Sequence, residues 1–112
     1  LGWRNLAMTA QKKKDAAGAI AAWRKAAALD PADYEVRDNL AAALVQEKRD
    51  ADALAVYKEM AALRPRSGAP HNAIGLVHLR LNRLDLALTA LQEAIRREKG
   101  FAPAHNNLGV LY

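Results

Sequence analysis

The sequence predicts an all-α protein in which antiparallel helix pairs repeat along the chain and stack into a solenoid. Small and large apolar residues recur every 34 residues, apolar residues within each interval follow a helical period, and proline and aspartate punctuate the intervals. The composition agrees, with 52% hydrophobic residues, many of them alanine, and only 5% aromatic residues. An alanine-rich core suits closely packed helices better than a sheet.

The period appears when the 112 residues are written in rows of 34. The aligned columns are Leu6, Leu40, Ile74 and Leu108; Ala7, Ala41, Gly75 and Gly109; Ala19, Ala53 and Ala87; Trp23, Tyr57 and Leu91; and Pro31 and Pro65. No step contains an insertion. The small column allows two helices to approach closely, and the column of Trp23 fills the adjacent space, as dense core packing requires.

The first helix pair is predicted over residues 2–14 and 17–29. Asp15 precedes the second helix and can cap its N-terminus. Pro31 ends that helix, because a proline disfavours helical geometry in the residue before it, here Asp30.

The second pair is predicted over residues 34–47 and 51–63. Asp50 is the expected N-cap of its second helix, and Pro65 ends it. The spacing repeats that of the first pair, so the two pairs should have the same construction.

The remaining helices are predicted over residues 70–81, 85–98 and 103–112. Ser67 or Gly68 opens the first of these, with Pro70 early in it, and Pro103 has the same position in the last. No proline follows residues 85–98, but Gly100 can end that helix.

These columns resemble the tetratricopeptide repeat (TPR), whose pattern is W-x2-L-G-x2-Y, then A-x3-F, then P. The matching residues are Trp3, Leu6, Ala19, Trp23, Ala26 and Pro31; Leu40, Leu44, Ala53, Tyr57 and Pro65; Ile74, Gly75, Ala87, Leu91 and Ala94; and the segment 104–112. The repeats span residues 1–33, 34–67 and 68–101, and residues 102–112 form the first helix of a fourth. The resemblance implies a right-handed superhelix whose first helices line a concave face that holds a partner. We expect this chain of 112 residues to be a fragment of a longer protein.

The sequence contains few of the residue patterns that support catalysis or metal binding. The chain has no cysteine, no nucleophile-elbow pattern and no phosphate-binding glycine loop. His71, His78 and His105 occupy the Trp and Tyr positions of the repeat, so we interpret them as packing residues. A metal site and a pH-sensitive role are the weaker alternatives. We therefore predict no enzyme activity and no cofactor.

The charge of +5 comes from basic clusters at the predicted helix C-termini, where cations suit the helix dipole. No aromatic residues alternate with them, so a nucleic-acid partner is not expected. No apolar run is long enough to span a bilayer, and direct membrane insertion is not expected. The sequence shows no targeting segment and does not distinguish a cytoplasmic from a periplasmic location.

The face of the first helices opposite the core is the candidate partner groove. Its predicted residues are Arg4, Asn5, Met8, Lys12, Asp38, Asn39, Ala42, Asn72, Leu76, Arg80, Asn106 and Asn107. This face also includes Leu1. The face exposes much apolar area, which favours a binding role over an ordinary solvated surface. Ala69 and Ala73 stand where the carboxylate clamp of some TPR domains needs basic residues, so binding of that kind is not expected.

Asn5, Asn39 and Asn107 share one column, which Ala73 interrupts next to Asn72. Amides spaced along a groove could pair with the backbone of an extended peptide, because each offers a donor and an acceptor. Some TPR domains fused to glycosyltransferases hold peptides this way. The alternative is that these amides bond within the scaffold. Arg4, Lys12 and Arg80 would favour an acidic partner segment.

The leading hypothesis is a non-catalytic scaffold that binds a protein or peptide partner. The alanine- and arginine-rich composition suggests a bacterial multiprotein assembly, such as one for envelope assembly, secretion or polysaccharide export. One alternative is a substrate-recruiting domain of an enzyme whose catalytic part lies outside this fragment. Another is self-association through exposed repeat ends near Leu108 and Tyr112.

Overall fold

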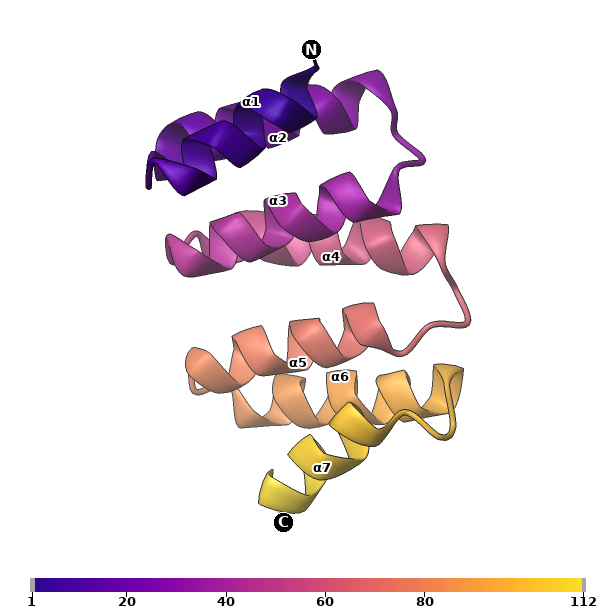
Figure 1. The fold of residues 1–112 in the computed structure, drawn as a ribbon. Coiled ribbons are helices and arrows are strands. Elements are labelled where there is room, and N and C mark those ends of the chain that lie inside the picture. The colour runs from indigo at the N-terminus through magenta and orange to yellow at the C-terminus, as the bar shows by residue number, and fades with distance from the viewer. Residues whose placement is uncertain (1, 112) are drawn as a thin grey trace. The chain divides into compact units, whose positions relative to one another are not determined.

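The structure, a computed structural model, describes residues 2–111, so Leu1 and Tyr112 lie outside the described residues. It contains seven helices and no strand within that range (Figure 1). The helices are α1 (Trp3–Lys12), α2 (Ala16–Leu29), α3 (Tyr34–Gln46), α4 (Asp50–Leu63), α5 (Ala69–Arg80), α6 (Leu84–Arg97) and α7 (Ala102–Leu111). The all-α prediction is confirmed, and every predicted helix end among the described residues lies within two residues of the observed one.

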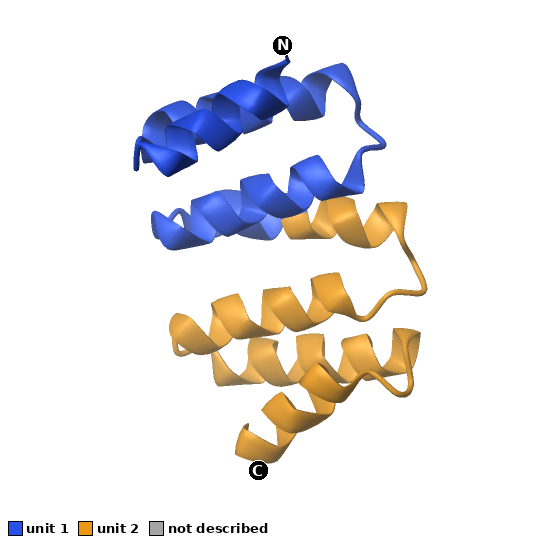
Figure 2. Ribbon diagram, viewed as in Figure 1, with its two compact units in different colours: residues 1–56 blue, residues 57–112 orange. Residues whose placement is uncertain are grey.

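The chain divides into two compact units, residues 1–56 and 57–112, which meet within α4 (Figure 2). In unit 1, α2 packs against both α1 and α3. In unit 2, α6 packs against both α5 and α7 in the same way. Each unit thus contains one antiparallel helix pair with the first helix of the next repeat packed on it.

Of the two aspartates predicted as helix N-caps, one is confirmed and one is corrected, and a third aspartate is an N-cap that was not predicted. The Asp15 carboxylate accepts a hydrogen bond from the Gly18 amide at 3.0 Å, which confirms the cap of α2. The prediction that Asp50 caps α4 is wrong by one position, because the Arg49 carbonyl accepts the first helical bond, from the Ala53 amide, and α4 begins at Asp50 itself. Asp33, which the sequence analysis did not identify, caps α3 through the Val36 amide at 3.2 Å.

The prediction that Gly100 ends α6 is also wrong. Helix α6 ends at Arg97, and Glu98 is its C-cap in extended backbone geometry. A carboxylate oxygen of Glu98 accepts a hydrogen bond from the Gly68 amide at 2.9 Å. This contact joins the end of α6 to the start of α5.

The turns inside the helix pairs form a periodic feature that sequence analysis missed. Lys14, Lys48 and Asn82 all have φ of 59°, in the left-handed region, and they stand 34 residues apart. The amide of the residue after each one bonds to the carbonyl five residues earlier, for example Asp15 to Ala10 at 2.8 Å. This is the Schellman arrangement that commonly ends helices. Glycine is the usual residue at that position, so the two lysines carry a conformational cost.

The core of each unit pairs a large residue with small ones. In unit 1, Trp23 on α2 is 1% exposed, and Ala7 and Ala41 on the neighbouring helices are 0% exposed. In unit 2, a Cβ added to Gly75 of α5 would lie 2.9 Å from the side chain of Leu91 on α6, so α5 and α6 approach as closely as glycine allows. Around Leu91, the side chains of Ile95, Phe101, Leu108 and Leu111 complete the cluster shared with α7.

Candidate protein-binding site

The candidate groove residues of unit 1 lie on α1 and α3. Arg4, Met8 and Lys12 are exposed along α1 and are separated by one helical turn each. The other predicted residues of this unit are Asn5, Asp38 and Ala42, which are exposed, and Asn39, which is half-buried. Helix α2 packs against both α1 and α3, and two hollows lie among these three helices; we call the surface that carries them the α1–α3 crevice.

One end of the crevice is a hollow of about 490 Å³ with an apolar lining, the Trp3 hollow. Its walls come from the start of α1, the end of α2 and the start of α3: Gly2, Trp3, Arg4, Asn5, Met8, Ala26, Leu29, Asp30, Asp33 and Val36. Trp3 is 40% exposed, Met8 50% and Leu29 74%. Apolar side chains of this size beside a hollow are available to a partner.

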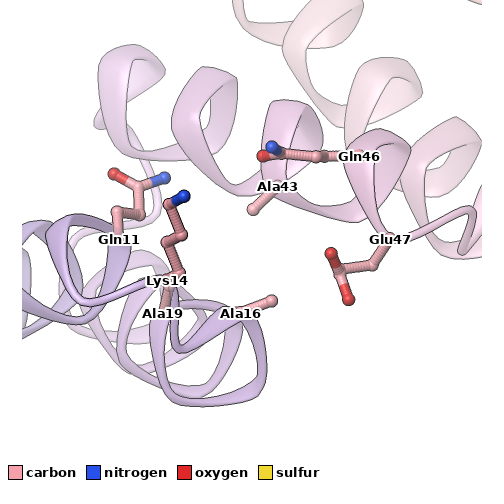
Figure 3. Close-up of a pocket in the computed structure, with 7 residues that line it drawn as sticks. All are labelled: Gln11, Lys14, Ala16, Ala19, Ala43, Gln46 and Glu47. Carbon is pink, nitrogen blue, oxygen red and sulfur yellow. The ribbon is translucent and has the colours of Figure 1, made fainter.

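The other, more polar end of the crevice is a hollow of about 480 Å³ with a mixed polar and apolar lining, the Lys14 hollow. It is lined by Gln11, Lys14, Ala16, Ala19, Ala43, Gln46 and Glu47. In Figure 3 the side chains of Gln11 and Lys14 face those of Gln46 and Glu47 across the hollow, and the alanines line its wall. The lining therefore offers an ammonium group, a carboxylate and two amides to whatever enters.

Acidic side chains surround Arg4 at the apolar end. Its guanidinium group lies 3.4 Å from a carboxylate oxygen of Asp33 and 3.4 Å from one of Glu35. The side chains of Arg4 and Glu35 are 50% and 75% exposed, so each ion pair is weak. Arg4 is thus already engaged by two carboxylates and is not a free cation for an acidic partner.

In unit 2 the predicted residues lie on α5 and α7. The Asn107 amide nitrogen donates a hydrogen bond to the Asn72 side-chain oxygen at 2.9 Å, so the two helices are joined by a part-buried amide pair. Leu76 is 44% exposed, and Arg80 and Asn106 are exposed. The side-chain amides of Asn72 and Asn107 therefore bond to each other within the scaffold. Each amide can still form further hydrogen bonds.

The histidines have distinct surroundings in unit 2. Burial lowers the pKa of His71 below its ordinary 6.5; the Glu93 charge opposes this shift, and Arg97 and Arg96 add to it. Burial also lowers the pKa of His78, aided by Arg83 and Lys58. Folding therefore disfavours the protonated form, and the contribution of both groups to stability falls as the pH is lowered through 6.5.

His105 is exposed, and its Nε2 lies 2.9 Å from the Lys99 carbonyl oxygen. Within residues 2–111, no group of three or more histidine, aspartate or glutamate side chains is arranged to hold a metal ion. In the same range, no helix is both long enough and apolar enough to cross a bilayer.

Sequence analysis missed the residues that the repeat joints contribute to the crevice. Leu29, Asp30 and Asp33 belong to the joint between α2 and α3, yet they line the hollow beside Trp3. Lys14 and Glu47 enter the other hollow from the ends of α1 and α3. A search restricted to one face of each first helix could not find them. The signal that could have identified them is that they stand at helix ends, at the same positions of the repeat.

The fold and the crevice define a helical-repeat protein. This chain belongs to the tetratricopeptide-repeat family, whose family model matches residues 4–70 and 72–112. TPR domains mediate protein–protein interactions and are generally non-catalytic. No curated protein matches the chain significantly.

Solved structures show the same fold. The MamA protein is 25% identical with a TM-score of 0.79, and the match covers 98% of this chain and 60% of that one. The first TPR of Spaghetti (RPAP3), bound to the HSP90 peptide SRMEEVD, is 20% identical with a TM-score of 0.78, covering 97% of this chain and 86% of that one. YrrB, described as a TPR protein with an unusual peptide-binding site, is 19% identical with a TM-score of 0.82. The match covers 96% of this chain and 55% of the YrrB chain. The chain thus spans about three fifths of the length of the MamA structure.

Proposed function

We propose that this TPR domain is a scaffold that binds an extended segment of a protein partner along its first helices, within a bacterial multiprotein assembly. The observation that carries the proposal is the α1–α3 crevice, with exposed Trp3 and Met8 beside a hollow of about 490 Å³. Such apolar area beside polar groups is typical of a surface that buries a partner.

The comparisons support the class of ligand. One structural neighbour is bound to a peptide, and another is described by its peptide-binding site. The absence of basic side chains at Ala69 and Ala73 argues against capture of a C-terminal carboxylate. An internal segment of the partner fits this chain better.

The asparagines have different expected roles in the two units. Asn107 is paired with Asn72, so its first role is to join α5 to α7. Asn5 and Asn39 form no side-chain hydrogen bond within residues 2–111, and their amides can meet the backbone of a peptide in the α1–α3 crevice. We therefore assign the partner-binding role of the column to Asn5 and Asn39.

The test is a selection of peptides from a random display library on the 112-residue chain, followed by calorimetric titration of the best binder. Replacing Asn5 and Asn39 together by alanine should weaken binding by about 1–3 kcal/mol, or roughly 5- to 150-fold, at 0.5–1.5 kcal/mol per hydrogen bond. The melting midpoint should stay unchanged, because both side chains lack partners in the scaffold.

The matched control is Lys25→Ala, at an exposed position on α2. It should leave affinity unchanged. If the double variant binds as tightly as the parent while the control does too, the crevice is not the binding site. Light scattering over a concentration series, run beside the titration, separates partner binding from self-association.

A further inference from the structure

We infer that the segment bound in the α1–α3 crevice carries an apolar side chain beside a lysine or arginine, and an acidic side chain about four positions away. This inference rests on the proposed function and specifies the chemistry of the partner. It follows from the opposite charges at the two ends of the crevice.

The apolar end is surrounded by acidic groups. Asp30 and Asp33 line the Trp3 hollow, and Glu35 lies beside it through its contact with Arg4. Two of these carboxylates, those of Asp33 and Glu35, contact the Arg4 guanidinium group, and that of Asp30 adds a third negative charge to the lining. The contacts of Arg4 are 3.4 Å long, whereas a well-formed charge-assisted hydrogen bond is about 2.7–2.9 Å. A second cation can enter here without breaking a strong ion pair.

The polar end is surrounded by basic groups. Lys14 lines this hollow, and the neighbouring helix ends carry Lys12, Lys13 and Lys48. Among residues 2–111, none of these four lysines forms an ion pair. Glu47 is the one carboxylate in the lining, and Gln11 and Gln46 can each donate a hydrogen bond to an entering carboxylate.

The distance between the ends sets the spacing in the partner. Helix α1 has 10 residues, so its ends are roughly 15 Å apart at about 1.5 Å per residue. An extended segment covers that length in about four to five residues, at roughly 3.3 Å each. The partner's cation and anion should therefore be separated by about that number of positions.

Helix dipoles alone favour acidic groups at helix starts and basic groups at helix ends. They do not account for Trp3, Met8 and Leu29, which are 40–74% exposed beside the acidic end. An apolar hollow with acidic side chains around it lies at one end of the crevice, and basic side chains lie at the other. This arrangement specifies the order of side chains in the ligand and not only its net charge.

The experiment uses two capped hexapeptides of identical composition, Lys-Leu-Ser-Asn-Ser-Glu and Glu-Leu-Ser-Asn-Ser-Lys. In the first, leucine stands beside the cation; in the second, beside the anion. Reversal of a bound peptide does not interconvert them, because the neighbour of leucine stays the same. Binding is followed at low salt through the indole N–H resonance of Trp3, with that of buried Trp23 as the internal reference.

The first peptide should bind at least about five-fold more tightly and shift the Trp3 resonance while that of Trp23 stays fixed. The charge-swapped variant, Glu35→Lys with Lys14→Glu, should reduce the preference to less than about two-fold, because it cancels most of the charge difference between the two ends. Circular dichroism must show the variant folded. Raising the salt concentration should reduce the difference, because exposed charges are screened.

Equal affinity of the two peptides, with both shifting Trp3, would overturn the inferred charge order and leave the proposed peptide-binding function standing. An unchanged preference in the folded charge-swapped variant would overturn it as well. If neither peptide shifts Trp3 while a display-selected peptide binds without shifting it, the partner site lies outside the crevice, and both the inference and the proposed site are wrong.

Discussion

In unit 1 the large core residue of α2 is Trp23, whereas the same repeat position on α6 in unit 2 holds Leu91. Both are at most 1% exposed. The neighbouring small residues are Ala7 and Ala41 in unit 1. In unit 2 the small residue on α5 is Gly75, whose missing Cβ is replaced by the Leu91 side chain. A smaller residue in the large column thus accompanies a smaller residue in the facing column.

In unit 2 both columns thus hold smaller residues than in unit 1, and the Leu91 side chain lies in the space that a Cβ on Gly75 would need. Interiors are packed to nearly constant density, so a change in one column must be matched in the facing one. The two units offer independent ways to test that rule, because each can be altered without touching the other's residues.

The largest expected effect is on the large residue. Trp23→Ala should lower the free energy of unfolding by about 3–5 kcal/mol, and Leu91→Ala by about 2–5 kcal/mol, because each leaves a cavity. Urea denaturation followed by circular dichroism measures both. A loss below about 1 kcal/mol for Trp23→Ala would show that this column is not the core column.

The next effect concerns the glycines of the small column. Gly75→Ala should cost about 1–3 kcal/mol, because the new Cβ would lie 2.9 Å from Leu91 and 3.3 Å from the Ala87 carbonyl oxygen. Gly109→Ala is the matched control: its Cβ would meet nothing within 4 Å, so it should stabilise α7 by about 0.5–1 kcal/mol. Combining Gly75→Ala with Leu91→Ala should cost less than the sum of the two single changes. Additive costs would refute the proposed contact.

A smaller effect is expected at the left-handed turns. Lys14→Gly and Lys48→Gly should each stabilise by about 0.5–1 kcal/mol, because glycine adopts φ of 59° without strain. Asn82→Gly should gain less, since asparagine tolerates this geometry. Thermal melting of the three variants gives the order. A larger gain at Asn82 than at either lysine contradicts the explanation.

The smallest effect is the pH dependence of an exposed ion pair in unit 2. Hydrogen bonds from Arg96 and Arg97 to Glu93, at 2.6–2.8 Å, lower the pKa of Glu93 to about 2. Since the folded pKa lies below the ordinary value of 4.5, the contribution to stability is complete above pH 4.5 and is lost as the pH falls through 2. Glu93→Gln should remove this slope. An NMR titration of the Glu93 carboxyl group near 4.5 would contradict it.

Much of the fold could be predicted because its determinants are local or periodic. The cap at Asp15 depends on residues within one turn, and the 34-residue columns repeat without insertion. The contact of Glu98 with Gly68 could not be predicted, because the two residues are 30 positions apart. The left-handed lysines were missed because lysine carries no signal for that geometry.

For the candidate site, the sequence placed Arg4, Met8 and their neighbours on the first helices, since helical spacing alone decides which residues share a face. It could not show that Arg4 is held by Asp33 and Glu35, or that Asn107 bonds to Asn72, because those partners are 29 to 35 residues apart. The sequence by itself thus determined the helices, their period and the family. Only the tertiary structure decided which polar groups are engaged and where hollows form, because both depend on contacts between different helices rather than on order along one helix.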